Sequence, residues 1–248
     1  ASIKDARGNF ATLTLPIPGA SNSLSANKDL VIDSLVPLMA DVAEGSLVAS
    51  VDLDFQSNNT SLDLAWSGSD DNSGINNYEY SLGTSKGGTE TIAWTSTSST
   101  SISLSDLTLT EATIYYVSVR ATDKAGNVST VMSGDGITID LSSPIAGTVN
   151  DGLGIDIAYT SALNSLSGNW SGFSDPVSGL SDYQYAIGTT INGTEVKGWA
   201  SNGLDTSFTY NGYELINTQV YFISVKVIDK VGNVSDTVSS NGVISDQE

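Results

Sequence analysis

Apolar and polar residues alternate with a period of two along much of this chain. Residues 62–66 follow this pattern, and so do residues 115–121, where apolar side chains recur at every second position. Such alternation is typical of strands that bury one face. Glycine-rich turn segments such as Ser73-Gly74 and Gly87-Gly88 separate the runs, and no stretch of ten residues has a helical period. The pattern predicts an all-β protein.

The same series of motifs occurs twice, 104 to 106 residues apart. The segment that begins at Trp66 returns at Trp170, and the segment that begins at Tyr115 returns at Tyr221. A period of this length is that of an independently folding domain and is too long for a solenoid repeat. About seven strand-like runs fit in each period, which indicates a β-sandwich. We therefore expect two sandwiches, at residues 36–140 and 141–248, arranged end to end.

In the second repeat the runs can be placed individually. We expect strands near residues 144–149, 155–159, 164–170, 181–187, 194–199, 205–210, 219–228 and 235–245.

Residues 1–35 are expected to be the C-terminal strand of a preceding, truncated repeat, followed by a linker. Asp5, Gly8 and Asn9 repeat an Asp-x-x-Gly-Asn motif of both modules, and residues 30–33 match residues 137–140. One interpretation is that the chain is a fragment of a longer array. The other is that a strand at residues 11–15 docks on a sheet edge, its own or a neighbour's.

Composition excludes several classes of function. The chain contains no cysteine and no histidine, so disulfides, thiol nucleophiles and imidazole bases are absent. We find no catalytic motif and expect no enzyme. Acidic residues number 28 against 9 basic ones, for a net charge of −19, which argues against a nucleic-acid partner. No apolar run is long enough to span a membrane, and residue 1 does not begin a signal peptide.

Larger groups of motifs resemble a known family. An early-strand Trp170, a Tyr221 strand with alternating valines and an Asp229 turn before the last strand resemble fibronectin type III and related immunoglobulin-like repeats of large secreted bacterial surface proteins. The resemblance covers residues 34–246 and the tail before them. It implies an extracellular or cell-surface location and a role as extension or adhesion modules, or as accessory domains of a secreted enzyme. No Arg-Gly-Asp sequence is present.

Aspartates provide the candidate metal site. In a fibronectin-like sandwich, the loop after the Trp strand and the turn before the last strand lie at the pole where the chain enters. Carboxylates gathered there repel one another unless they are hydrated or bridged by a hard cation such as Ca²⁺. The alternative is that each aspartate only caps its own turn. The expected ligands are Asp33, Asp70, Asp71 and Asp123 in the first module, and Asp140, Asp175 and Asp229 in the second.

Four tryptophans divide into two pairs. Trp66 and Trp170 end a main strand and are expected in the core. Trp94 and Trp199 each follow a glycine-rich hairpin, where an exposed ring could contact a carbohydrate. Two functions therefore remain open: a structural or adhesive stalk, with calcium at its joints, and a carbohydrate-binding accessory module. The expected partners are neighbouring repeats of the same chain and a surface glycan or protein.

Overall fold

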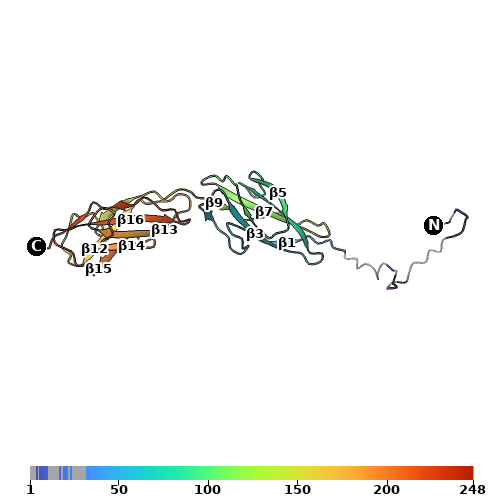
Figure 1. Ribbon diagram of the computed structural model, residues 1–248, viewed down its shortest axis with the longest axis horizontal. Coiled ribbons are helices and arrows are strands. Elements are labelled where there is room, and N and C mark those ends of the chain that lie inside the picture. The colour runs from blue at the N-terminus through green and yellow to red at the C-terminus, as the bar shows by residue number, and fades with distance from the viewer. Residues whose placement is uncertain are drawn as a thin grey trace.

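The computed structural model describes residues 4, 6–10, 17, 19–21, 23 and 32–247. Within these residues the regular elements are eighteen β-strands, which confirms the all-β prediction. The strands form two sandwiches, which Figure 1 shows in line rather than side by side. This end-to-end arrangement was also predicted. None of the described residues belongs to a helix that is long and apolar enough to cross a membrane.

The first sandwich packs a three-stranded sheet against a larger one. The small sheet has the order β1-β3-β6, and the large sheet has the order β2-β9-β7-β4-β5, with β8 paired to β7. Neighbouring strands are antiparallel except for β2 and β9. The strands are β1 (Leu38–Glu44), β2 (Phe55–Gln56), β3 (Leu62–Ser69), β4 (Ile75–Gly83), β5 (Ile92–Thr97), β6 (Ser101–Leu104), β7 (Ile114–Asp123), β8 (Met132–Ser133) and β9 (Ile137–Ile139).

The second sandwich repeats this topology strand for strand. Its sheets have the orders β10-β12-β15 and β11-β18-β16-β13-β14, with β17 paired to β16. The strands are β10 (Thr148–Asp151), β11 (Tyr159–Thr160), β12 (Ser165–Ser171), β13 (Leu180–Gly188), β14 (Lys197–Ser201), β15 (Ser207–Asn211), β16 (Val220–Asp229), β17 (Val238–Ser239) and β18 (Val243–Ser245).

Three expected strands of the second repeat differ from the observed ones. The first starts only at Thr148, because Ile145 makes just an isolated bridge to Ser174. The second is reduced to Tyr159–Thr160. The last is split into β17 and β18, because Gly242 between them has a φ of 96°, which an extended strand does not allow.

Each sandwich encloses one tryptophan between its sheets. Trp66 is 1% exposed and Trp170 is 2% exposed, as the sequence predicted. The Trp66 ring stacks on Tyr80 with 5.7 Å between centroids, and the Trp170 ring lies 5.5 Å from Tyr183. The alternating residues of β7 and β16 complete the two cores.

A tyrosine fixes the corner before the central strand of each large sheet. The hydroxyl of Tyr115 accepts a hydrogen bond from the Thr110 amide at 3.0 Å, and the hydroxyl of Tyr221 accepts one from the Ile216 amide at 2.9 Å. A hydroxyl bonded to backbone a few residues upstream is the tyrosine corner of immunoglobulin-like sandwiches.

Loss of this hydroxyl should destabilise the sandwich that contains it. Tyr221→Phe leaves the Ile216 amide without its acceptor and should lower the free energy of unfolding of the second sandwich by about 1 kcal/mol. Urea unfolding measures the change. The matched control is Tyr159→Phe, whose ring is exposed and whose hydroxyl should contribute less than about 0.5 kcal/mol. Equal effects in the two variants would contradict the corner's role.

The described part of the N-terminal arm repeats a turn of both modules. Lys4 and Phe10 form an antiparallel bridge like those of Thr122 with Val128 and Ile228 with Val234. Gly8 has a φ of 85°, close to the 95° of Gly126 and the 94° of Gly232. The described residues around Gly8 therefore have the same turn conformation as those around Gly126 and Gly232. The strand expected at residues 11–15 lies outside the described residues.

Candidate metal centres at the module heads

Three aspartates meet where the second sandwich begins. Asp140 directly follows β9 of the first sandwich, Asp175 opens the turn after β12, and Asp229 ends β16. One carboxylate oxygen of each lies within 4.8 Å of the others. Asp140 and Asp229 are buried, and Asp175 is half-buried. The fold thus brings together carboxylates from three separate segments, one of which belongs to the preceding module. We call Asp140, Asp175 and Asp229 the second head group.

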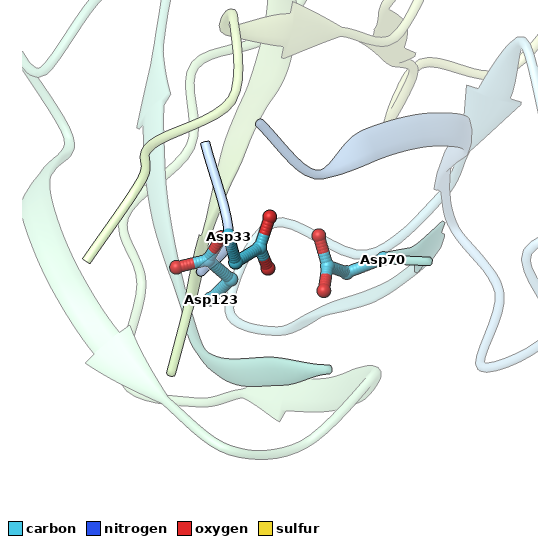
Figure 2. Close-up of side chains that lie close together, drawn as sticks. All are labelled: Asp33, Asp70 and Asp123. Atoms are coloured by element: carbon cyan, nitrogen blue, oxygen red, sulfur yellow. The ribbon is translucent and has the colours of Figure 1, made fainter. Parts of the chain in front are cut away.

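The first sandwich has the corresponding group at its own entry. Asp33, Asp70 and Asp123, which we call the first head group, also offer oxygens within 4.8 Å of one another. Figure 2 shows the Asp33 and Asp70 side chains pointing toward each other, with Asp123 beside Asp33. Asp71, which was predicted to join this group, does not. Its side chain is exposed, because Asp70 occupies the inward position of the turn, and its counterpart in the repeat is Pro176.

One oxygen of each loop aspartate caps its own turn. Asp175 Oδ1 accepts hydrogen bonds from the amides of Val177, Ser178 and Gly179 at 3.0, 2.9 and 3.0 Å. Asp70 Oδ2 accepts equivalent bonds from Ser73 and Gly74 at 3.0 and 2.7 Å. The turn-capping interpretation therefore describes part of what these residues do.

The second oxygen of each loop aspartate has no such partner. Asp70 Oδ1 and Asp175 Oδ2 are buried, and neither accepts a hydrogen bond from any described residue. A buried carboxylate oxygen without a donor costs free energy, and the cost rises when other carboxylates stand nearby. A cation between the three aspartates would remove this cost.

Hydrogen bonds tie the linker to both sandwiches. Asp140 Oδ2 accepts a bond from the Ser178 amide at 3.1 Å. The Asn233 side chain donates to the carbonyl oxygens of Asp140 and Ser142 at 3.3 and 2.9 Å. On the other side, the Glu111 carboxylate of the first sandwich accepts bonds from the Leu141 amide and the Ser142 hydroxyl at 2.6 and 3.1 Å. The head group thus sits at a joint that is already partly ordered.

Local donors stabilise the charged forms of two aspartates in the first head group. Hydrogen bonding from Ser73 is the largest effect on Asp33 and lowers the pKa of its carboxyl. For Asp123 the largest effect is burial, which raises the pKa, but bonds from Asn127 and the turn amides outweigh it and leave the pKa lowered. Both groups therefore remain anionic at neutral pH, the state in which they can bind a cation.

Basic side chains of the described residues do not neutralise the second head group. The ion pair found among these residues joins Arg120 to Glu79 at 2.8 Å and includes none of the head aspartates. Lys230, which follows Asp229 directly, places its Nζ 5.5 Å from the centre of the Phe55 ring of the first sandwich. The lysine thus contacts the neighbouring module rather than the carboxylates.

Two surface tryptophans were predicted as possible carbohydrate contacts. Trp199 is 36% exposed, and Trp94 is half-buried. Lys226 Nζ lies 4.6 Å from the Trp199 ring centre, and Arg120 Cζ lies 4.7 Å from the Trp94 ring centre. Each indole therefore has a cation over one face, an arrangement that stabilises the sheet surface and leaves at most the opposite face for a sugar.

Comparison with known proteins gives limited sequence similarity. No family model matches the chain. Exoglucanase B of Cellulomonas fimi is 28% identical over 178 residues, which are 71% of this chain and 14% of that protein. The chain thus spans a small part of this relative's length. The chicken CNTN1 FN1–FN3 domains align over 85% of this chain and 68% of theirs, with 16% identity and a TM-score of 0.41.

Topology and the tyrosine corner identify the fold. In each module a three-stranded sheet faces a larger sheet. At the edge of the larger sheet, β5 pairs with β4 in the first module and β14 pairs with β13 in the second. Each module also bonds the tyrosine hydroxyl to upstream backbone, a hallmark of immunoglobulin-like sandwiches. Both modules are fibronectin type III-like β-sandwiches. The fold that the family resemblance implied is confirmed.

A second acidic group of the first fibronectin type III-like module was not predicted from the sequence. Glu44, Asp52 and Asp135 offer oxygens within 4.8 Å of one another. Glu44 ends β1, whose buried positions do not alternate regularly, so the local sequence does not show that its carboxylate turns inward. A usable signal lies in the repeat itself, because Glu44 and Gly134 of the first module align with Asp151 and Ser240 of the second.

Proposed function

We propose that this chain is a non-catalytic, extracellular extension segment whose modules are joined through calcium at their heads. The main support is that the same three-aspartate head recurs in both modules. In each head one carboxylate oxygen is buried and accepts no hydrogen bond from described residues. Calcium takes several oxygen ligands in flexible geometry, and three aspartate carboxylates supply part of such a ligand set.

The position of Asp140 gives such an ion a mechanical role. Asp140 extends the last strand of the first sandwich, where its amide donates to the Gln56 carbonyl at 2.9 Å. Asp175 and Asp229 belong to the second sandwich. A cation bound to all three carboxylates would link the two modules and restrict the angle between them. Such restriction suits a segment that holds a binding or catalytic domain at a distance from a surface.

Calcium should stabilise the folded chain by mass action. At about 2 mM calcium, and with dissociation constants on the order of 10⁻⁴ M, each occupied head gains roughly 2 kcal/mol over the chelated protein. Differential scanning calorimetry with calcium or with chelator measures the shift. Asp175→Asn keeps the turn cap but removes a charged ligand, so it should abolish the response of the second module while leaving that of the first.

The control for this experiment is Asp205→Asn, which removes an exposed charge outside both heads. It should retain the full response to calcium. A wild-type melting curve that is unchanged by millimolar calcium would contradict the proposal and leave the aspartates as turn residues.

A carbohydrate-binding accessory role is the second candidate. It is favoured by the exposed Trp199 and by the similarity to a stretch of a bacterial exoglucanase. On this account Trp199→Ala abolishes binding on a glycan array, whereas calcium chelation does not. Absence of binding to any glycan by the wild-type chain would eliminate this candidate and leave the extension role.

A further inference from the structure

A buried carboxylate lies inside the first sandwich, far from the head aspartates in the fold. Glu44 is 0% exposed, at the end of β1 where the small sheet meets β7. Its Oε1 accepts a hydrogen bond from the Val117 amide at 2.9 Å. Its Oε2 is buried and accepts no hydrogen bond from any described residue. One half of this carboxylate therefore has a structural partner and the other half does not.

Two further carboxylates approach Glu44 from the solvent side. Asp52 returns to the end of β1, where its Oδ1 accepts a bond from the Glu44 amide at 2.7 Å. Asp135 lies in the break between β8 and β9. Oxygens of the three side chains lie within 4.8 Å of one another. Asp52 and Asp135 also line an open surface hollow beside Ala40 and Ser50, so an ion could reach the group from solvent.

The second sandwich has a corresponding group of side chains, in which the third residue is not acidic. Asp151 replaces Glu44, Asp156 replaces Asp52, and Asn241 stands where the first module has Asp135. The Asp151 amide donates to Asp156 Oδ1 at 2.9 Å. The side-chain amide of Asn241 donates a hydrogen bond to Asp156 Oδ2 at 2.8 Å. An amide donor thus bonds to this acidic pair, whereas the first module adds a third negative charge.

The residue that accepts a hydrogen bond from the central strand also differs between the two modules. In the second module the Ser240 hydroxyl accepts a hydrogen bond from the Ile223 backbone amide at 3.0 Å. Gly134 takes the place of Ser240 in the first module and has no hydroxyl, so the longer Glu44 reaches the equivalent Val117 amide. A Cβ at Gly134 would clash with the Glu44 carboxylate. The first module therefore makes room for the longer Glu44 side chain, whereas the second module buries the shorter Asp151.

Electrostatics indicate that three anions are not held together without compensation. The three carboxylates lie within 4.8 Å of one another, and the Glu44 side chain is fully buried. Ionised carboxylates in such a group need a cation or a shared proton. Because the unpartnered Oε2 belongs to a fully buried side chain, either a cation or a proton must satisfy it.

We propose that Glu44, Asp52 and Asp135 bind one hard divalent cation, of the calcium type, and that the second sandwich lacks this site. Oxygen-only ligands select calcium or magnesium over softer metals. The ion would fasten the 45–54 loop and the break between β8 and β9 to the end of β1. This site is independent of the head groups, which lie on other loops.

The test removes the head sites first, so that the two proposals can fail separately. The full chain with Asp70→Asn and Asp175→Asn should still bind one calcium ion per molecule in equilibrium dialysis at millimolar calcium. Adding Asp135→Asn should reduce this number to zero. Asn241 occupies the equivalent position in the second sandwich, so Asp135→Asn copies a residue that the fold accepts, and near-ultraviolet circular dichroism checks the folding.

A reciprocal variant adds a site where none is expected. Asp151→Glu, Ser240→Gly and Asn241→Asp together give the second module the ligand set of the first. This chain should bind one more calcium ion than its parent. As a second readout, calcium should slow hydrogen exchange of the Val117 amide in the wild type but not in Asp135→Asn.

Two results would overturn the proposal. One is that the chain without head sites binds no calcium, which would show that Glu44 takes a proton instead. The other is that Asp135→Asn leaves the number of bound ions unchanged.

Discussion

Replacing Trp170 with alanine should lower the free energy of unfolding of the second sandwich by about 3–5 kcal/mol. The indole is 2% exposed and contacts Tyr183 and Phe208, with ring centroids 5.5 and 6.1 Å away. Truncation removes these contacts and leaves a cavity that two packed sheets cannot close, because interiors of this kind are densely packed.

Urea unfolding monitored by calorimetry and fluorescence measures this loss. The matched control is Trp199→Ala, which removes a partly exposed indole from β14 of the same sandwich and should cost less than about 1 kcal/mol beyond its contact with Lys226. A loss of under about 1 kcal/mol for Trp170→Ala would contradict the placement of this side chain between the sheets.

The stability of the second sandwich should fall as pH rises through the slightly acidic range, and Asp151 should cause much of this fall. Burial, with a smaller contribution from the charge of Asp156, raises the pKa of Asp151 from 3.8 to about 6. The folded state therefore binds this proton more tightly than the unfolded state. The stabilisation is complete below about pH 4 and is lost as pH rises past about 6, a change of about 3 kcal/mol.

Asp151→Asn removes this titration and should flatten the pH dependence. At about pH 8 the variant should be more stable than the wild type, and at about pH 4 the difference should vanish or reverse. Urea unfolding in chelator at several pH values measures it. Asp205→Asn, an exposed aspartate of the same sandwich, should keep the wild-type profile. A constant difference between Asp151→Asn and wild type across this range would contradict the account.

Much of the fold could be predicted because the alternation marks strands that bury one face, and the same strands recur in both repeats. Strands that bury one face show a period of two, and β7 and β16 follow it closely. The short strands escaped prediction for an equally physical reason. Elements such as β11 and β17 are two residues long, and they depend on pairing with distant strands rather than on a local pattern.

The grouping of the aspartates at the module heads could be predicted in part. Asp140, Asp175 and Asp229 were expected together because the topology brings three loops to one pole, and they do meet. Asp71 was expected with the first group but does not join it, because sequence does not show which of two adjacent aspartates points inward. Glu44 was missed since its role depends on Gly134, 90 positions away in the chain, whose lack of a side chain leaves room for the carboxylate.

We propose that a cation at Asp140, Asp175 and Asp229 sets the angle between the two modules. Because the chain has no cysteine, Ser98→Cys and Thr194→Cys place one spin label on an exposed loop position of each sandwich. Pulsed electron–electron resonance then gives the distribution of distances between the labels. We expect a narrow distribution in millimolar calcium that broadens in chelator, and a broad one in both conditions after Asp140→Asn. A distribution of the same width with and without calcium would contradict the claim.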